Sequence, residues 1–125
     1  MADASGGPQL DLGATVTESQ RLLDRGATEE AGVLLAGTAR DAPDGEIELW
    51  QGLALLIEGL ALVNRGESEA AGFALRRGRD LVGPYQAAPP HALDVDGLVG
   101  WATHLIDDLA VEKAPRPPVP RLRLP

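Results

Sequence analysis

The most continuous hydrophobic pattern in the chain covers residues 46–64, which are apolar on every side of a helical projection. A surface helix shows one apolar stripe and one polar face. Here large apolar side chains point in all directions: Leu49, Trp50, Leu53, Leu55, Leu56, Ile57, Leu60, Leu62 and Val63. The uncharged run between Gln51 and Glu58 is far shorter than the roughly 18 apolar residues of a membrane-spanning helix. The pattern therefore predicts a buried, central helix in an all-α fold.

Four further segments predict helices around this one. The first begins at Thr17, with Gln20 at the spacing of a capping box. The second and fourth helices of the chain begin at Thr28 and Ser68, whose hydroxyl groups are typical N-caps. The last helix follows Asp94 and has one apolar stripe: Val95, Leu98, Ala102, Leu105 and Leu109. We predict a small helical bundle in which one central buried helix is surrounded by the others.

The composition changes near both ends of the chain and divides it into three parts. Residues 1–15 are rich in glycine and show little periodicity, so we expect a flexible lead. Residues 16–112 carry the helical pattern and form the bundle domain. Residues 113–125, KAPRPPVPRLRLP, contain five prolines, which exclude a helix and favour an extended or polyproline II path.

We predict that this proline-rich basic tail lies extended against a surface, from residue 115 to residue 125. The surface is either the body of this chain or a neighbouring copy, and the alternative is a tail that docks nowhere. The tail combines apolar and cationic side chains, and both kinds are candidates for contact with a partner. The predicted contact residues are Val119, Leu122, Leu124, Arg121 and Arg123.

Charge is unevenly distributed along the chain, whose net charge is -8. Residues 1–112 hold 7 basic and all 19 acidic residues, a net charge of -12, whereas residues 113–125 carry +4. An acidic body argues against nucleic-acid binding, which needs a basic surface. The absence of cysteine excludes disulfides and thiolate metal sites, and the start, MADASGGPQLD, lacks the features of a signal peptide. We expect a cytoplasmic protein that binds neither membrane nor nucleic acid.

One internal echo suggests a repeated unit. RGATEEAGVLLAG begins at Arg25 and RGESEAAGFALRRG begins at Arg65, forty residues later. Each combines a glycine suited to end a helix with a hydroxyl residue suited to begin the next. A forty-residue period is typical of paired-helix repeats, although two copies are fewer than the three that such repeats usually need. The alternative is that any two helix–turn–helix corners look alike.

The central helix carries two polar residues that are candidates for ligand binding. Gln51 and Glu58 are seven residues apart and therefore lie about 20° apart on one face of the helix. A buried carboxylate must be neutralised, paired or hydrogen-bonded, so the pair predicts a polar pocket. The alternative is a gap between neighbouring helices, where Glu58 meets water or an arginine. On another face, Gly52 and Gly59 indicate that a neighbouring helix packs very close.

The histidines supply no catalytic or metal-binding pattern. His104 and Asp108 are one helical turn apart, which is more typical of a surface ion pair than of an oriented base. His91 follows two prolines in a loop and has no partner close in the sequence. The acidic residues are scattered, so we predict no catalytic residue, no metal ligand and no cofactor.

Several motifs together resemble a known bacterial family. Trp50-Gln-Gly-Leu53 is similar to a Leu-Gln-Gly-Leu motif at the start of that family's central helix. Arg65-Gly66, the helix of residues 70–81 and Leu93-Asp-Val-Asp96 also have counterparts, the last in a Gly-Ile-Asp segment. The likeness runs from residue 26 to residue 109, and the family is the one named domain of unknown function 309. The resemblance implies a small helical bundle with one central helix surrounded by others.

The chain departs from this family at its polar signature. The family's second helix carries His-Glu-x-x-Glu after a Gly-x-x-x-x-Ala start, and Gly26 and Ala31 match that start. The signature positions themselves hold small or apolar residues: Gly32, Val33 and Ala36. On the central helix Gln51 remains, while a second glutamine of the family is replaced by Leu55. The chain thus resembles a divergent member, and the resemblance implies a fold and no activity.

The leading functional hypothesis is a non-enzymatic helical domain that binds another protein or forms a homodimer. The missing polar cluster, the paired helices and the basic tail favour it. The alternative is a small-molecule-binding protein or enzyme that uses a polar pocket beside Gln51 and Glu58. A third hypothesis is that the fold serves only as a part of a larger complex.

Overall fold

The computed structural model describes residues 11–111 and 117–123, and all of its regular structure is helical. The α-helices are α1 (Leu12–Asp24), α2 (Thr28–Asp41), α3 (Ile47–Asn64), α4 (Ser68–Val82) and α5 (Val95–Ala110). Short 3-10 helices lie between them: η1 (Asp44–Glu46), η2 (Gly83–Tyr85) and η3 (Pro90–Ala92). Within these ranges there is no strand, so the prediction of an all-α fold is confirmed.

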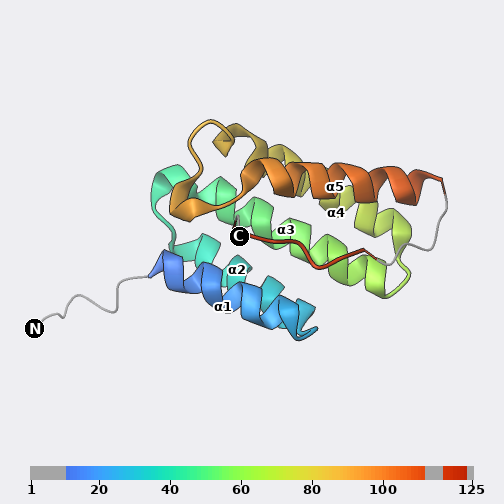
Figure 1. Cartoon of the computed structure of the whole chain (residues 1–125), viewed down its shortest axis with the longest axis horizontal. Helices are drawn as coiled ribbons and strands as arrows, with labels where there is room; N and C mark the ends of the chain where they lie inside the picture. Colours follow the sequence, from blue (N-terminus) through green and yellow to red (C-terminus); the bar gives the residue numbers. More distant parts are fainter. Residues whose placement is uncertain (1–10, 112–116, 124–125) are drawn as a thin grey trace, which may run out of the picture.

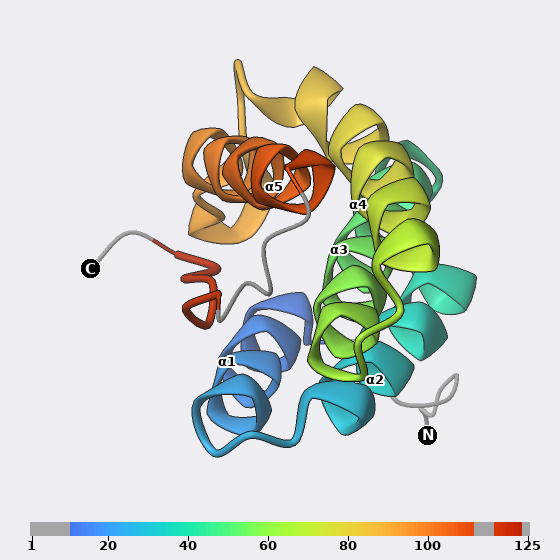
Figure 2. The same ribbon diagram turned by 90° about the vertical axis from the view of Figure 1, so that its right-hand side faces the viewer.

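The helices are arranged as an arc in chain order (Figures 1 and 2). α3 packs most extensively against α4 and α2, while α1 packs on α2 and α5 packs on α4. Seen nearly end-on in Figure 2, α3 stands in the middle of the arc and α1 and α5 form its two ends. Residues 117–123 lie in the mouth of the arc, between α1 and α5, in both views. The fold is therefore a curved layer of helices whose opening is closed by the tail.

The central position predicted for α3 is confirmed, but its burial is incomplete. Most of the helix belongs to the hydrophobic core, and Trp50, Leu53 and Leu56 are fully buried. A stripe on its outer side stays accessible, where Gln51 and Glu58 are exposed. This stripe is the gap between neighbouring helices that the sequence left open for Gln51 and Glu58, because α2 and α4 flank α3 without meeting over it. None of the described helices is long and apolar enough to cross a bilayer.

Glycines allow α3 and α4 to approach each other closely, as the sequence predicts. A β-carbon built on Gly52 would lie 2.9 Å from the carbonyl oxygen of Gly78, and one on Gly78 would lie 2.8 Å from that of Gly52. A β-carbon on Gly59 would lie 2.7 Å from the side chain of Leu75. Since real β-carbon contacts are never this short, the contact between the two helices requires glycine at these positions.

The two echoed segments form equivalent corners. Gly26 and Gly66 have positive φ angles of 83° and 80°, the left-handed conformation that glycine adopts cheaply. The residue after each glycine donates to a carbonyl five residues back, from Ala27 to Leu22 and from Glu67 to Leu62. This is the Schellman arrangement, and it ends α1 and α3 in the same way. The echo therefore corresponds to two successive helix pairs, α1–α2 and α3–α4.

The predicted starts of α2 and α4 are confirmed, but the predicted hydroxyl caps are wrong. Thr28 and Ser68 are the first residues of α2 and α4, and the caps before them, Ala27 and Glu67, make no side-chain capping bond. Glycine in the left-handed conformation and the Schellman bonds already fix these corners, so a hydroxyl cap is not needed. α3 likewise follows η1 and has no side-chain cap.

The first helix begins earlier than predicted. α1 starts at Leu12 inside the expected flexible lead, with Asp11 as its cap, and the Asp11 carboxylate accepts from the backbone N–H of Ala14 at 2.9 Å. Leu12 and Val16 extend the buried stripe of the helix, so tertiary packing outweighs the nearby glycine. At the other end of the molecule, the predicted cap Asp94 is confirmed by its bond from the N–H of Gly97 at 3.0 Å.

Candidate functional site

Gln51 and Glu58 lie together on the outer side of the arc, in a cleft of ≈ 490 Å³ between α2, α3 and α4. Arg40 and Arg77 line the same cleft, and all four side chains are exposed. None of the four forms a hydrogen bond or ion pair with another described residue. The geometry is that of a gap between neighbouring helices, where Glu58 meets water. Small-molecule sites enclose most of their ligand around a few converging polar groups, and this cleft has no such enclosure.

The two histidines have different surroundings. His104 is 81% exposed and its Nε2 lies 3.6 Å from Asp108, so this pair is a surface contact, as the spacing predicts. His91 is only 23% exposed, and its Nε2 lies 2.7 Å from the Glu46 carboxylate. The sequence shows no partner for His91 because Glu46 is 45 residues earlier in the chain. The indole of Trp50 donates to the same carboxylate at 3.1 Å.

The polar cluster of Glu46, His91 and Trp50 changes the acidity of its carboxyl group. Burial by itself raises the pKa of Glu46. The hydrogen bonds from His91 and Trp50, together with the charge of His91, outweigh burial and hold the pKa of Glu46 below its ordinary value of 4.5. The cluster is thus an ionised carboxylate with two donors beneath the loop that connects α4 to α5.

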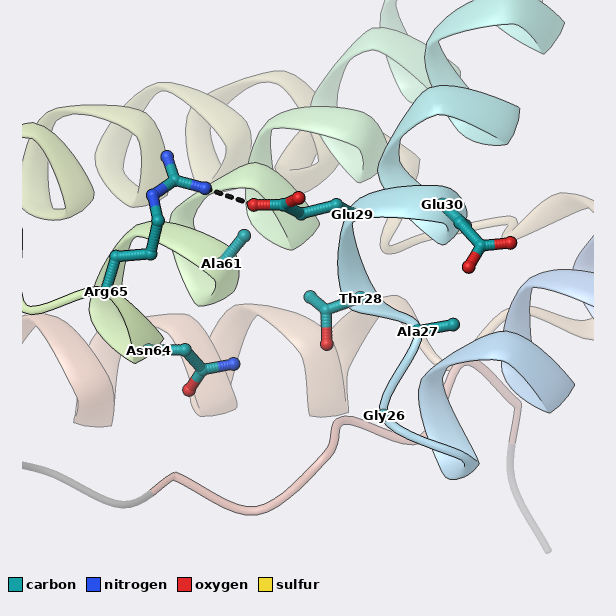
Figure 3. Close-up of a pocket in the computed structure, with 8 residues that line it drawn as sticks. All are labelled: Gly26, Ala27, Thr28, Glu29, Glu30, Ala61, Asn64 and Arg65. Atoms are coloured by element: carbon teal, nitrogen blue, oxygen red, sulfur yellow. Dashed lines mark hydrogen bonds and ion pairs between the residues drawn. The ribbon is translucent and has the colours of Figure 1, made fainter.

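The pocket shown in Figure 3 lies where the two glycine corners meet, and has a volume of ≈ 360 Å³. Arg65, at the end of α3, reaches Glu29 in the first turn of α2 and also bonds Glu67 at 3.0 Å. The hydrogen bond to Glu67 is the main reason that the pKa of Arg65 is raised. Since both of its carboxylate partners belong to this chain, Arg65 joins the two helix pairs, and the pocket offers no unpaired cation to a ligand.

The described part of the tail receives hydrogen bonds from α1, from α5 and from the residue before α5. Gln20 on α1 binds it in two places: its Nε2 donates to the carbonyl of Pro120 at 3.1 Å, and its Oε1 accepts from the N–H of Leu122 at 2.9 Å. The N–H of Asp94 donates to the carbonyl of Leu122 at 2.7 Å. On α5, the indole of Trp101 donates to the carbonyl of Pro118 at 3.0 Å. Carbonyls of alternate residues are therefore bound along an extended segment.

From Val119 to Leu122 the side chains of the tail alternate between exposed and buried. Leu122 is 1% exposed and Pro120 is buried, whereas Val119 is 37% exposed and Arg121 is exposed. This period of two is that of an extended chain lying with one face in a groove. We call the groove between α1 and α5 the tail groove, and its described walls are α1, α5 and η3. A cleft of ≈ 390 Å³ runs beside the tail, along Val16 and Gln20 of α1.

Among the described residues of the tail, Arg123 makes the most side-chain hydrogen bonds. Its guanidinium donates to three oxygens: the carbonyl of His91 at 3.1 Å, the hydroxyl of Thr17 at 2.9 Å and the carbonyl of Gly13 at 2.9 Å. Arg121 instead forms one ion pair with Asp24 at 3.1 Å, and its side chain is 60% exposed. An exposed pair of this kind contributes little to stability.

The carbonyl that Arg123 binds is presented by a strained turn. His91 and Ala92 both have a φ of 59°, a left-handed conformation that costs about 1–2 kcal/mol for a residue other than glycine. The turn is held on one side by the contact between His91 and Glu46 and on the other by Arg123. Leu93 then pairs with Arg123 in an isolated antiparallel bridge. The turn therefore forms one wall of the tail groove.

The structure places three of the predicted contact residues against the body of the same chain: Leu122, Arg121 and Arg123. Val119 is the partly exposed exception, and Leu124 lies outside the described residues. Their contact with a partner stays a prediction. Sequence reasoning missed the receiving side chains, which are Gln20, Thr17 and Trp101, because each meets the tail across a long stretch of sequence. The only local signal was their polarity on otherwise regular helices.

Comparisons with family models, curated proteins and solved structures find no match for this chain. The resemblance to the domain of unknown function 309 stays a prediction. In the described part of the chain, no group of three or more histidine, aspartate or glutamate side chains is arranged to hold a metal ion. The tail groove, where several elements bind main-chain groups of an extended segment, is the candidate functional site.

Proposed function

We propose that this protein is an interaction domain whose tail groove binds an extended segment of protein, and that its own tail occupies this groove. The observation that carries the proposal is the recognition of backbone groups on alternate residues. Gln20 and Trp101 supply side-chain donors to tail carbonyls, and Asp94 supplies a backbone N–H. Donors aimed at main-chain groups, with pockets for alternate side chains, are the means by which proteins bind extended peptides.

The shape of the fold and the composition of the tail support the same function. Stacked helix pairs form curved layers whose concave side is a common binding surface. A proline-rich segment loses little conformational entropy when it docks, because it is already extended in solution. The basic tail also meets a body with an excess of acidic residues. The alternative is that the tail never leaves the groove and serves only to stabilise the fold.

Peptide binding by the full-length chain distinguishes these views. Leu122→Asp places a charge in an apolar pocket and releases the tail from the groove. Val119→Asp is the matched control, since it adds the same charge at an exposed position of the same segment. A fluorescent peptide with the sequence of residues 113–125 is titrated into the parent and both variants, and its polarisation is measured.

We expect saturable binding to the Leu122→Asp chain, and binding at least about tenfold weaker to the parent and to Val119→Asp. The reason is that a tethered segment competes at an effective concentration in the millimolar range. Circular dichroism confirms that the variants are helical, and Leu122→Ala replaces Leu122→Asp if the latter unfolds. Absence of saturable binding to a folded, tail-released variant would contradict the proposal.

A further inference from the structure

We infer that the ligand class of the tail groove is an extended segment of another protein carrying the pattern Pro-x-Leu-Arg, with the arginine as the main determinant of specificity. The inference rests on the proposed function and deepens it. In this chain the pattern is formed by Pro120, Leu122 and Arg123, with Arg121 at the variable position. The tail is then an internal competitor that resembles the ligand.

The first two positions of the pattern follow from burial. Leu122 and Pro120 are the buried side chains of the described tail, two residues apart, and so face the same wall of the groove. The N–H of Leu122 is bound by Gln20, and proline has no N–H, so proline is excluded at the leucine position. At Pro120 only the carbonyl is bound, so proline fits there. Together these contacts define the order and spacing of the two apolar residues.

The arginine position follows from the geometry of its acceptors. The three oxygens around Arg123 come from two different elements of the fold, α1 and the η3 turn. All three are uncharged, so the position selects the directions of the N–H groups rather than positive charge alone. A guanidinium presents five donors in a rigid plane, whereas the ammonium of lysine is a single point with three donors. Lysine therefore cannot reach the three acceptors together.

The remaining space in the groove favours a partner over a second copy of this chain. A tail from another copy makes the same contacts as the tethered tail, so it has no advantage in binding free energy. The cleft of ≈ 390 Å³ beside the tail is lined by Val16 and Thr17 on one side and by the tail itself on the other, and the tail does not fill it. A segment that carries the pattern and also fills this cleft makes additional contacts. Such a ligand can displace the tail.

The test uses a set of peptides with the sequence of residues 113–125, added to the full-length Leu122→Asp chain. One peptide is unchanged, and the others carry Arg123→Lys, Arg121→Lys or Leu122→Ala. We expect Arg121→Lys to bind within about twofold of the unchanged peptide, because its single ion pair is exposed and is available to lysine as well. We expect Arg123→Lys and Leu122→Ala each to bind at least about tenfold more weakly.

The outcomes separate this inference from the proposed function. If Arg123→Lys binds as well as the unchanged peptide, the specificity inference is wrong and the peptide-binding function stands. If none of the peptides binds, the proposed function itself is wrong. Light scattering of the parent chain tests the choice of occupant. A dimer that becomes a monomer on Leu122→Asp assigns the groove to a second copy and overturns the commitment to a different protein, whereas a monomer in both chains supports it.

Discussion

At the scale of single residues, the contacts that the sequence does not reveal are those between residues far apart in the chain. Gln20 is predicted as half of a capping box, yet its amide binds the tail about a hundred residues later in the chain. His91 has no partner close in the sequence, yet it lies against Glu46 in the structure. Helix capping is a local property that spacing can reveal, whereas these contacts depend on how distant segments meet in space. The chemistry of the site was therefore hidden although its tail residues were recognised.

Ser19 is a buried polar residue whose substitution should stabilise the protein. Its side chain is 0% exposed and its hydroxyl has no hydrogen-bond partner among the described residues. An unsatisfied buried hydroxyl costs about 1–3 kcal/mol, and alanine is the better helix former. Ser19→Ala should raise the free energy of unfolding by about 1 kcal/mol in a denaturant titration. A loss of stability of that size would show that the hydroxyl has a partner.

Glu46 should make the free energy of unfolding decrease at acidic pH. Burial alone raises its pKa, but the donors His91 and Trp50 lower the pKa in the folded state below 4.5. A lowered folded pKa contributes stability above the ordinary pKa, and this contribution is lost as the pH falls through the folded value. Urea titrations at about pH 7 and about pH 3.5 should therefore show a larger acid-induced loss in the parent than in Glu46→Gln. Glu48→Gln, which removes an exposed carboxylate nearby, is the matched control.

At the scale of elements, the apolar periodicity predicted the helices better than it predicted their ends. The glycines of α3 correctly indicated a close neighbour, because a missing side chain in a helix interior has few other uses. The N-caps of α2 and α4 were less predictable than their first residues, since the Schellman corners at Gly26 and Gly66 make hydroxyl caps unnecessary. The open stripe of Gln51 and Glu58 was also ambiguous, because a helix shows its own faces but not how far its neighbours extend.

The contact between α3 and α4 leads to a prediction at Gly78. A β-carbon there would lie 2.8 Å from the carbonyl oxygen of Gly52 and 2.9 Å from the backbone nitrogen of Leu56. Both neighbours are backbone atoms of a buried helix, so the two helices must separate to relieve the clash. Gly78→Ala should lower the free energy of unfolding by about 1–3 kcal/mol, the usual range for overpacking.

Gly100 provides the matched control for this prediction. It lies in the interior of α5, and a β-carbon there would have no neighbour within 4 Å. Gly100→Ala should therefore raise stability by up to about 1 kcal/mol, the difference in helix propensity. Thermal unfolding followed by circular dichroism measures both variants. Equal effects of the two substitutions would contradict the close packing of α3 on α4.

At the scale of the whole molecule, the arc is open without its tail. α1 and α5 form the ends of the arc, and the tail lies between them with Leu122 buried (Figure 2). Composition predicted a docked tail, since a basic, proline-rich segment with apolar side chains accompanies an acidic body. It left open whether the tail docks on its own chain, because that depends on where α1 and α5 end in space. The predicted apolar contact is carried by Leu122, while Val119 is partly exposed.

Ending the chain after Glu112 should therefore lower the melting temperature. The truncation empties the Leu122 pocket and leaves Gln20 and Trp101 without their tail acceptors. Emptying a buried leucine site costs about 2–5 kcal/mol, and about 1 kcal/mol corresponds to about 4–8 °C in a domain of this size. Calorimetry should therefore show that the melting temperature of the truncated chain is lower by at least about 8 °C. Added salt should change the decrease little, because the exposed pair of Arg121 and Asp24 contributes little to docking.

Restoring the tail as a separate molecule completes this prediction. A ligand that binds only the folded state raises the melting temperature in proportion to the logarithm of its concentration above Kd. The peptide of residues 113–125, added to the truncated chain, should therefore recover part of the lost stability. The same peptide with Leu122→Asp should recover none, because it cannot fill the buried pocket. An unchanged melting temperature after truncation would mean that the tail does not hold α1 and α5 together. If the melting temperature decreases and the peptide does not restore it, the tail stabilises the fold only when it is covalently attached.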